Sequence, residues 1–145
     1  MLAQTGAMDL YGDATAIGKL ALFLAVERRD GAMVDTLLHA GVSVNAKDSK
    51  GQTALFRATR RQDAMMIKLL ISENIEIDSR DDEGRTAWST NVKSRNKDIL
   101  GILLRHGADP STRGLQGVSP LYEAATDGET ELVRFLLESG TNPSI

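Results

Sequence analysis

The sequence predicts an all-α solenoid, in which similar helix-turn-helix units stack one on the next. Three columns of residues support this prediction, because each recurs at a spacing of 33 residues along the 145-residue chain. The columns are the glycines Gly18, Gly51, Gly84 and Gly117; the turn-forming residues Gly41, Asn74, Gly107 and Gly140; and the leucines Leu37, Leu70, Leu103 and Leu136. Glycine and asparagine tolerate a left-handed backbone, which a helix end often requires. A fixed period of this length is typical of proteins built from stacked repeats.

The same columns divide the chain into units. We expect four repeats at residues 18–50, 51–83, 84–116 and 117–145, the last of which is cut short as its final loop begins. Residues 1–17 are expected to form an N-terminal cap or a partial repeat. Such an array is long enough to bury a substantial core.

Each unit is expected to hold two short helices, and the second repeat illustrates the pattern. A first helix can start on the N-cap Thr53 and run to Arg60, with apolar residues three and four positions apart on one face. A polar turn at 61–63 follows, and a second helix stops near Asn74. Helices this short are marginal alone, so we expect stacking between repeats to stabilise them.

A hexapeptide motif near the start of each unit identifies a family. It reads TALFRA from Thr53, TAWSTN from Thr86 and SPLYEA from Ser119. With the period, these residues resemble the ankyrin-repeat family, whose signature is T-P-L-H-x-A, over residues 18–145. The resemblance implies paired antiparallel helices followed by a hairpin-like loop that projects to one side. The phrases GRTAW and GADPSTRG also resemble those in ankyrin arrays of large fungal proteins with a NACHT-type nucleotide-binding domain.

The third repeat departs most from the pattern. Trp88 stands where the other repeats have leucine, and Asn91 stands where they have alanine. A buried asparagine without hydrogen-bond partners costs roughly 1 to 3 kcal/mol, and a buried tryptophan N–H also needs an acceptor. These two residues mark either a locally repacked core or a binding pocket.

The sequence lacks the patterns of a catalytic or metal site, so we expect a protein that is not an enzyme and uses no cofactor. His39 and His106 lie at expected helix ends, where a cation is favoured by the helix dipole, and Ser119 is expected to be a cap. The chain has no cysteine, no secretory signal and no apolar run long enough to span a membrane. This combination favours an intracellular protein, cytoplasmic or nuclear.

Function is therefore expected to lie in a binding surface. The resemblance implies that loop tips and first helices line a groove, and the cations at these positions are Lys19, Arg28, Lys47, Arg60, Arg61, Arg80, Arg85, Lys93 and Arg113. A column formed by Lys47, Arg80 and Arg113 suits an acidic or phosphorylated peptide. The same charges could serve solubility alone, and acidic residues in the same loops cancel part of the field. The net charge of −3 disfavours nucleic acid.

Two hypotheses about function remain. In the first, the chain is a protein–protein interaction module that binds a protein or an acidic peptide. In the second, it is a structural or regulatory spacer array within a larger multidomain protein, with no separate ligand. The last repeat keeps the apolar pattern of the internal ones, so we also expect an uncovered C-terminal edge that promotes self-association through residues such as Val133, Phe135, Leu136 and Leu137.

Overall fold

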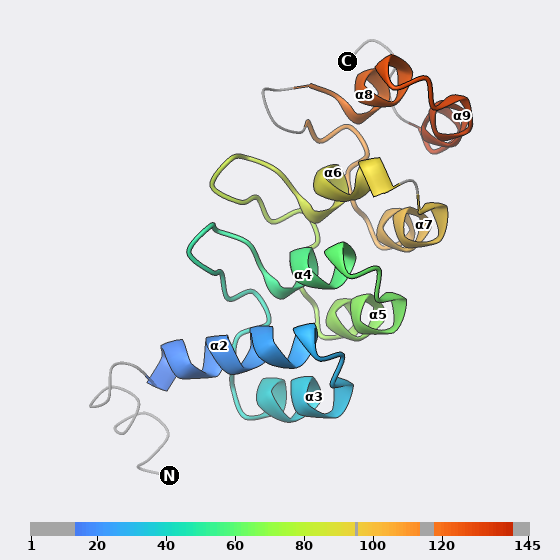
Figure 1. The fold of residues 1–145 in the computed structure, drawn as a ribbon. Helices are drawn as coiled ribbons and strands as arrows, with labels where there is room; N and C mark the ends of the chain where they lie inside the picture. Colours follow the sequence, from blue (N-terminus) through green and yellow to red (C-terminus); the bar gives the residue numbers. More distant parts are fainter. Residues whose placement is uncertain (1–13, 95, 114–117, 141–145) are drawn as a thin grey trace.

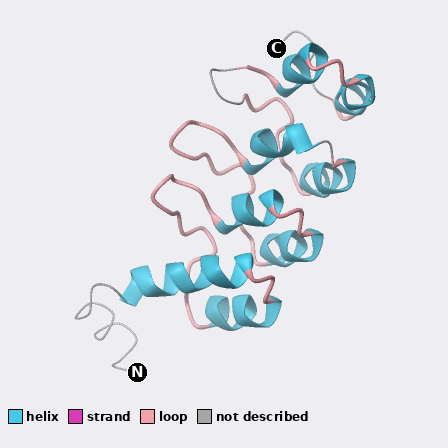
Figure 2. Cartoon of the chain, viewed as in Figure 1, coloured by secondary structure: helices cyan, strands magenta, loops and turns pink. Residues whose placement is uncertain are grey.

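The computed structural model describes residues 14–94, 96–113 and 118–140. Within these ranges the chain forms helices joined by turns and loops, and no strand (Figure 2). The helices come in four pairs: α2 (Ala14–Glu27) with α3 (Gly31–His39), α4 (Ala54–Arg60) with α5 (Ala64–Ser72), α6 (Ala87–Asn91) and the 3-10 helix η2 (Val92–Ser94) with α7 (Lys97–Arg105), and α8 (Pro120–Thr126) with α9 (Thr130–Glu138).

The pairs stack into a solenoid, which confirms the predicted fold. The first helices α2, α4, α6 and α8 form one layer, and the second helices α3, α5, α7 and α9 form the other (Figure 1). The loops that connect one pair to the next project together to one side (Figure 1). The loops and the first helices therefore lie along the same side of the molecule (Figure 1).

The second helices begin and end where the sequence pattern places them. Asp63 caps α5, and its side chain accepts a hydrogen bond from the N–H of Met66 at 3.1 Å. The equivalent residues Asp30 and Asn96 cap α3 and α7 in the same way. At the other end, the four turn-forming residues at 41, 74, 107 and 140 all have positive φ, from 65° to 104°. The expected left-handed turns are thus confirmed, and Asn74 serves as well as glycine because asparagine tolerates this region.

The core lies between the helix layers and between neighbouring repeats. Leu70, Leu103 and Leu136 are fully buried, and so are Leu55 and Trp88 at another equivalent position. The alanines at 25, 58 and 124 are at most 3% exposed, and the first helices pack α2 on α4 and α4 on α6. Small residues at these positions let neighbouring first helices approach closely.

The first repeat differs from the expectation at its start. Helix α2 begins at Ala14, so the expected boundary between residues 17 and 18 falls inside a helix. Gly18 is therefore a helical residue, whereas Gly51 and Gly84 lie in loops with φ of +78°. The hydrophobic run of this helix continues toward the N-terminus without a turn-forming N-cap such as Thr53, which explains the longer helix. Gly117 and most of the expected N-terminal cap, residues 1–13, lie outside the described residues.

The predicted hydroxyl caps of the first helices are confirmed in two repeats of three. Thr86 and Ser119 accept hydrogen bonds from the N–H groups of Ser89 and Tyr122. Thr53 holds the N-cap position of α4 through its backbone, but its hydroxyl makes no cap hydrogen bond and is buried without a partner among the described residues. The prediction that α4 starts on the N-cap Thr53 is therefore confirmed, although the hydroxyl takes no part in the cap.

The fourth repeat shows a partly exposed apolar face. Leu132 and Leu136 are buried, Val133 and Phe135 are half-buried, and Leu137 is 46% exposed. In the part of the chain that the structure describes, no helix is both long enough and apolar enough to cross a bilayer.

Candidate binding groove

Two equivalent aspartates stabilise the turns of the hairpin loops beside the first helices. Asp48 accepts hydrogen bonds through Oδ1 from the N–H groups of Lys50 at 2.8 Å and Gln52 at 3.0 Å. Asp81, one repeat further on, accepts from the N–H groups of Glu83 and Arg85, both at 2.9 Å. A carboxylate that bonds the backbone two and four residues ahead fixes a turn locally. The shape of these loops is therefore encoded within each repeat.

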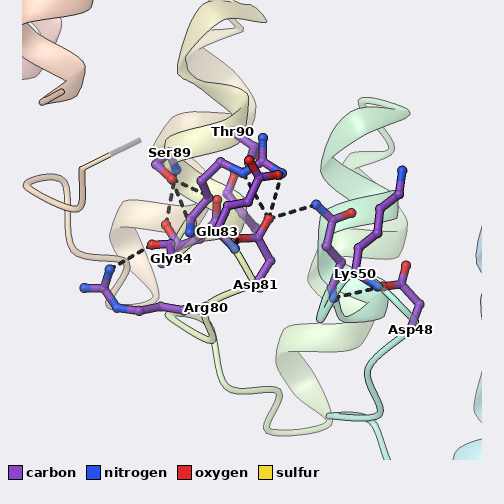
Figure 3. Close-up of polar contacts among 12 residues, drawn as sticks. Asp48, Lys50, Arg80, Asp81, Glu83, Gly84, Ser89 and Thr90 are labelled. Carbon is purple, nitrogen blue, oxygen red and sulfur yellow. Dashed lines mark hydrogen bonds and ion pairs between the residues drawn. The ribbon is translucent and has the colours of Figure 1, made fainter. Parts of the chain in front are cut away.

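Neighbouring loops are also bonded to each other, as Figure 3 shows around Asp81. The N–H of Asp82 donates to the carbonyl of Lys50 at 3.0 Å, and the Lys47 ammonium donates to the carbonyl of Arg80 at 3.1 Å. A Cβ atom added to Gly51 would lie 2.9 Å from the backbone nitrogen of Asp82. The glycine is therefore required both for its positive φ and for the close approach of the next loop. The first two loops form one cohesive wall.

The carboxylate of Asp81 is a buried electrostatic link in this wall. Its side chain is 1% exposed, and Oδ2 accepts from Gln52 Nε2 and from Arg85 Nε, both at 3.0 Å. Burial raises the pKa of Asp81, but the hydrogen bonds from Gln52, Arg85 and the Glu83 N–H outweigh burial and lower the pKa overall. Asp81 is therefore ionised at neutral pH and joins its own loop to the preceding loop, which carries Gln52.

Two adjoining clefts lie along the face between the loops and the first helices. The polar cleft has a volume of about 730 Å³, and its walls include Thr90, Asn91 and Arg85. The mixed cleft has a volume of about 650 Å³, and its walls include Leu20, Phe23, Leu24 and Lys19. The two clefts share Ser49, Lys50, Gln52 and Arg60, so they are sections of one groove.

The predicted cations have different roles in this groove. Arg60 borders both clefts, Arg85 lines the polar cleft and Lys19 lines the mixed cleft. Lys47 and Arg80 bind loop carbonyls, Arg85 pairs with Asp81 and Glu83 at 2.9 Å, and Arg61 pairs with Glu27 at 3.3 Å. Arg28 and Arg113 are exposed and line neither of these clefts, and the Lys93 side chain lies outside the described structure. The structure thus places Lys19, Arg60 and Arg85 in the clefts and uses several of the others to hold loops and repeats together.

Sequence reasoning missed two groove cations. Lys50 is exposed, borders both clefts and directly precedes the loop glycine Gly51, a position that could have revealed it. Arg57 stacks over the Phe23 ring at 4.4 Å and pairs with Asp48 at 3.0 Å and Glu27 at 3.4 Å. These three partners lie in the repeat before that of Arg57, so the pairing of the Arg57 charge could not be read from sequence.

Trp88 and Asn91, the two departures of the third repeat, have separate roles. Trp88 is fully buried, and its indole N–H donates to the carbonyl of Pro110 at 3.2 Å, so it belongs to a repacked core. Asn91 is 4% exposed and lines the polar cleft, where its Oδ1 accepts from Gln62 Nε2 at 2.9 Å.

The orientation of the Asn91 amide is fixed by its neighbours. Gln62 Nε2 also donates to the carbonyl of Thr59 at 2.7 Å, and a carbonyl can only accept, so this atom must be the amide nitrogen. The oxygen of Asn91 must therefore face Gln62. Its Nδ2 remains a buried donor that has no partner among the described residues.

The histidines are placed as the sequence predicts. His39 ends α3 and His106 follows the last residue of α7. A hydrogen bond to the backbone carbonyl of Asp35, followed by the charges of Asp35 and Glu73, raises the pKa of His39, which favours its protonated form at this helix end. Within the described residues, no group of three or more His, Cys, Asp or Glu side chains is arranged to hold a metal ion.

Comparison with known families agrees with the fold and the repeated loops. A model described as ankyrin repeats in three copies matches residues 22–114, and a single ankyrin-repeat model matches residues 116–145. The chain therefore belongs to the ankyrin-repeat family, whose members generally act as protein–protein interaction modules. No curated protein matches the chain, so the resemblance to fungal NACHT-type proteins stays a prediction.

Proposed function

We propose that the chain is an interaction module that binds a protein or peptide in the groove formed by its loops and first helices, and that this partner is acidic. The observation that carries the proposal is the pair of adjoining clefts with a shared border of Lys50 and Arg60. An open groove with walls from successive repeats suits an extended peptide, because each repeat can contact a further residue along it.

The balance of charges supports an acidic partner. Among the described residues, Lys19, Lys50 and Arg60 form no ion pair with a carboxylate, whereas Asp48 beside them pairs with Arg57, and Glu27 pairs with both Arg57 and Arg61. Arg60 donates only to the neutral oxygen of Gln52 at 2.8 Å. The mixed cleft and the shared border therefore carry a positive surplus that an acidic side chain would complement.

The second hypothesis, a spacer array without a separate ligand, is favoured by the other cations. Lys47, Arg80 and Arg85 hold loops in place, so part of the charge of the loop face serves cohesion between repeats. Under this hypothesis Lys50 and Arg60 would only keep the surface solvated.

The test is binding of acidic peptides to groove variants. Peptides selected from a random library on the immobilised chain would be titrated against wild type, the double reversal Lys50→Glu with Arg60→Glu, and the control Lys68→Glu. Lys68 is an exposed cation on α5, in the other helix layer, and lines neither cleft. We expect the groove reversal to abolish binding and the control to bind as wild type does. The affinity of wild type should fall as the salt concentration rises. Equal binding by all three proteins would contradict the proposal that peptides bind in the groove. Failure to select any peptide would favour the hypothesis of a spacer array without a separate ligand.

A further inference from the structure

We propose that the mixed cleft recognises an apolar anchor residue of a linear peptide, and that an acidic residue close to this anchor binds Lys50 and Arg60 at the shared border. This inference rests on the proposed function, and it specifies which peptides the groove selects.

The repeats themselves provide the comparison that supports an apolar anchor. Leu20 occupies the position of the hydroxyl residues Thr53, Thr86 and Ser119 in the other repeats. Leu24 occupies the position of Arg57, Thr90 and Glu123. Both positions are thus polar in every other repeat, so neither needs an apolar residue for stacking.

These leucines are exposed and lie at the same hollow. Leu20 is 63% exposed and Leu24 is 51% exposed, and both line the mixed cleft together with Phe23. Leu20 is helical because α2 begins at Ala14, seven residues before the position equivalent to Ala54, the first residue of α4. Leu24 is equivalent to Arg57, which lies within α4. The extra turns make α2 longer than the other first helices (Figure 1), and Leu20 lies within them. An apolar side chain that enters the cleft would remove this leucine surface from water.

The charged border defines the neighbouring residue of the peptide. Lys50 and Arg60 line both clefts, and neither forms an ion pair with a carboxylate of the described residues. The polar cleft beyond them is less suited to an acid, because Asp82 and Glu83 are in its walls and Arg85 is already paired. A carboxylate is therefore best placed at the border, within a few residues of the apolar anchor.

The experiment uses a phage-displayed library of random peptides selected on the full chain. We expect the enriched sequences to combine a leucine, isoleucine, methionine or phenylalanine with a nearby aspartate or glutamate. One enriched peptide, synthesised with a fluorescent label, would then be titrated against the double variant Leu20→Ser with Leu24→Ser. Met65→Ser is the matched control, because Met65 is 77% exposed on α5 and lines neither groove cleft.

The expected result is a loss of affinity of about tenfold or more in the leucine variant and none in the control. Replacing the anchor of the peptide by alanine should weaken binding to wild type but should have little further effect on the leucine variant, since the two changes remove one contact. Peptide binding that depends on Lys50 and Arg60 but not on the leucines would overturn this inference and leave the proposed function intact. Binding that depends on neither pair would overturn both.

Two other occupants of the mixed cleft are distinguished by measurements on the same variants. If the leucines pack against residues 1–13 of the chain, the leucine variant would unfold at lower urea concentration while peptide binding stayed unchanged. If they pack against a second copy, wild type would self-associate in sedimentation experiments and the leucine variant would not. Either result would overturn the inference.

Discussion

Replacing Asp81 tests whether its buried carboxylate stabilises the contact between the loops more than an exposed surface charge does. In Asp81→Asn the side-chain oxygen can still accept from the N–H groups of Glu83 and Arg85, which preserves the local turn. The new NH2 group, however, faces two donors, Gln52 Nε2 and Arg85 Nε, which each lie 3.0 Å from Oδ2 in wild type. The substitution therefore removes the side-chain link between the two loops while changing the shape of the residue very little.

The structure sets the size of the loss. Two hydrogen bonds to a charged acceptor contribute about 1.5–3 kcal/mol each, but Arg85 can keep its pair with Glu83 and is partly hydrated. Gln52 could turn its oxygen toward the new amide, although this would break its bond of 2.8 Å with Arg60. We therefore expect Asp81→Asn to lower the free energy of unfolding by about 2–4 kcal/mol. The control Glu83→Gln alters a side chain that is 56% exposed and should cost less than about 1 kcal/mol.

Urea unfolding followed by circular dichroism would measure both variants, and pH provides a second check. The pKa of Asp81 is lowered in the folded state from its ordinary value of 3.8. Its stabilising contribution is therefore fully present above pH 3.8 and is lost as the pH falls through the folded-state pKa. The gap between wild type and Asp81→Asn should stay constant from neutral pH to about pH 5 and narrow below pH 3.8. Equal stability of Asp81→Asn and Glu83→Gln would refute this reasoning, and so would a difference between wild type and Asp81→Asn that does not change with pH.

Three further predictions concern the loops, the core and the open end. Gly51→Ala should destabilise the chain by roughly 1–3 kcal/mol more than Gly41→Ala in urea unfolding, because both glycines have positive φ but, of these two, only Gly51 would bring a new Cβ within 3 Å of a described neighbour, the backbone nitrogen of Asp82. Leu70→Ala or Leu103→Ala should cost about 2–5 kcal/mol by thermal unfolding, since both are fully buried, and a loss below about 1 kcal/mol would contradict the repeat register. Sedimentation should show mass rising with concentration and Leu137→Ser should reduce this association, whereas a strictly monomeric wild type would show that the fourth repeat closes the array.

The features predictable from sequence are those that each repeat encodes locally. The turn residues at 41, 74, 107 and 140 and the leucines at 70, 103 and 136 need only their own helix pair to define them, so a column at a fixed period predicts both turn and core. The start of α2 could not be found this way, because the first repeat has no preceding loop in register with it. Its helix extends to Ala14 in the place where a loop would be expected.

The groove was harder to predict because its charges are paired between repeats. A sequence register shows that Lys47, Arg80 and Arg85 lie in loops, but not that their donors bind carbonyls and carboxylates of the loop wall. The contact of Lys47 with Arg80 joins residues 33 positions apart and depends on the distance between stacked loops, whereas the contacts of Arg80 with Gly84 and of Arg85 with Asp81 span four residues within one loop. Lys50 and Arg60 have no carboxylate partner in the described structure. They can be identified as the unpaired cations of the groove only once the paired cations are known.

The last two repeats carry opposite net charges. The third repeat holds six Lys or Arg against two Asp, a net charge of +4, and the fourth holds one Arg against five Asp or Glu, a net charge of −4. Within the described ranges, one ion pair crosses the interface between these repeats, Lys97 with Glu131 at 3.7 Å, and both side chains are largely exposed. Such an exposed pair contributes at most about 1 kcal/mol, and the opposed net charges add a longer-range field. The field falls from positive to negative across this one interface, and it would favour a partner whose acidic end lies toward the third repeat rather than the fourth.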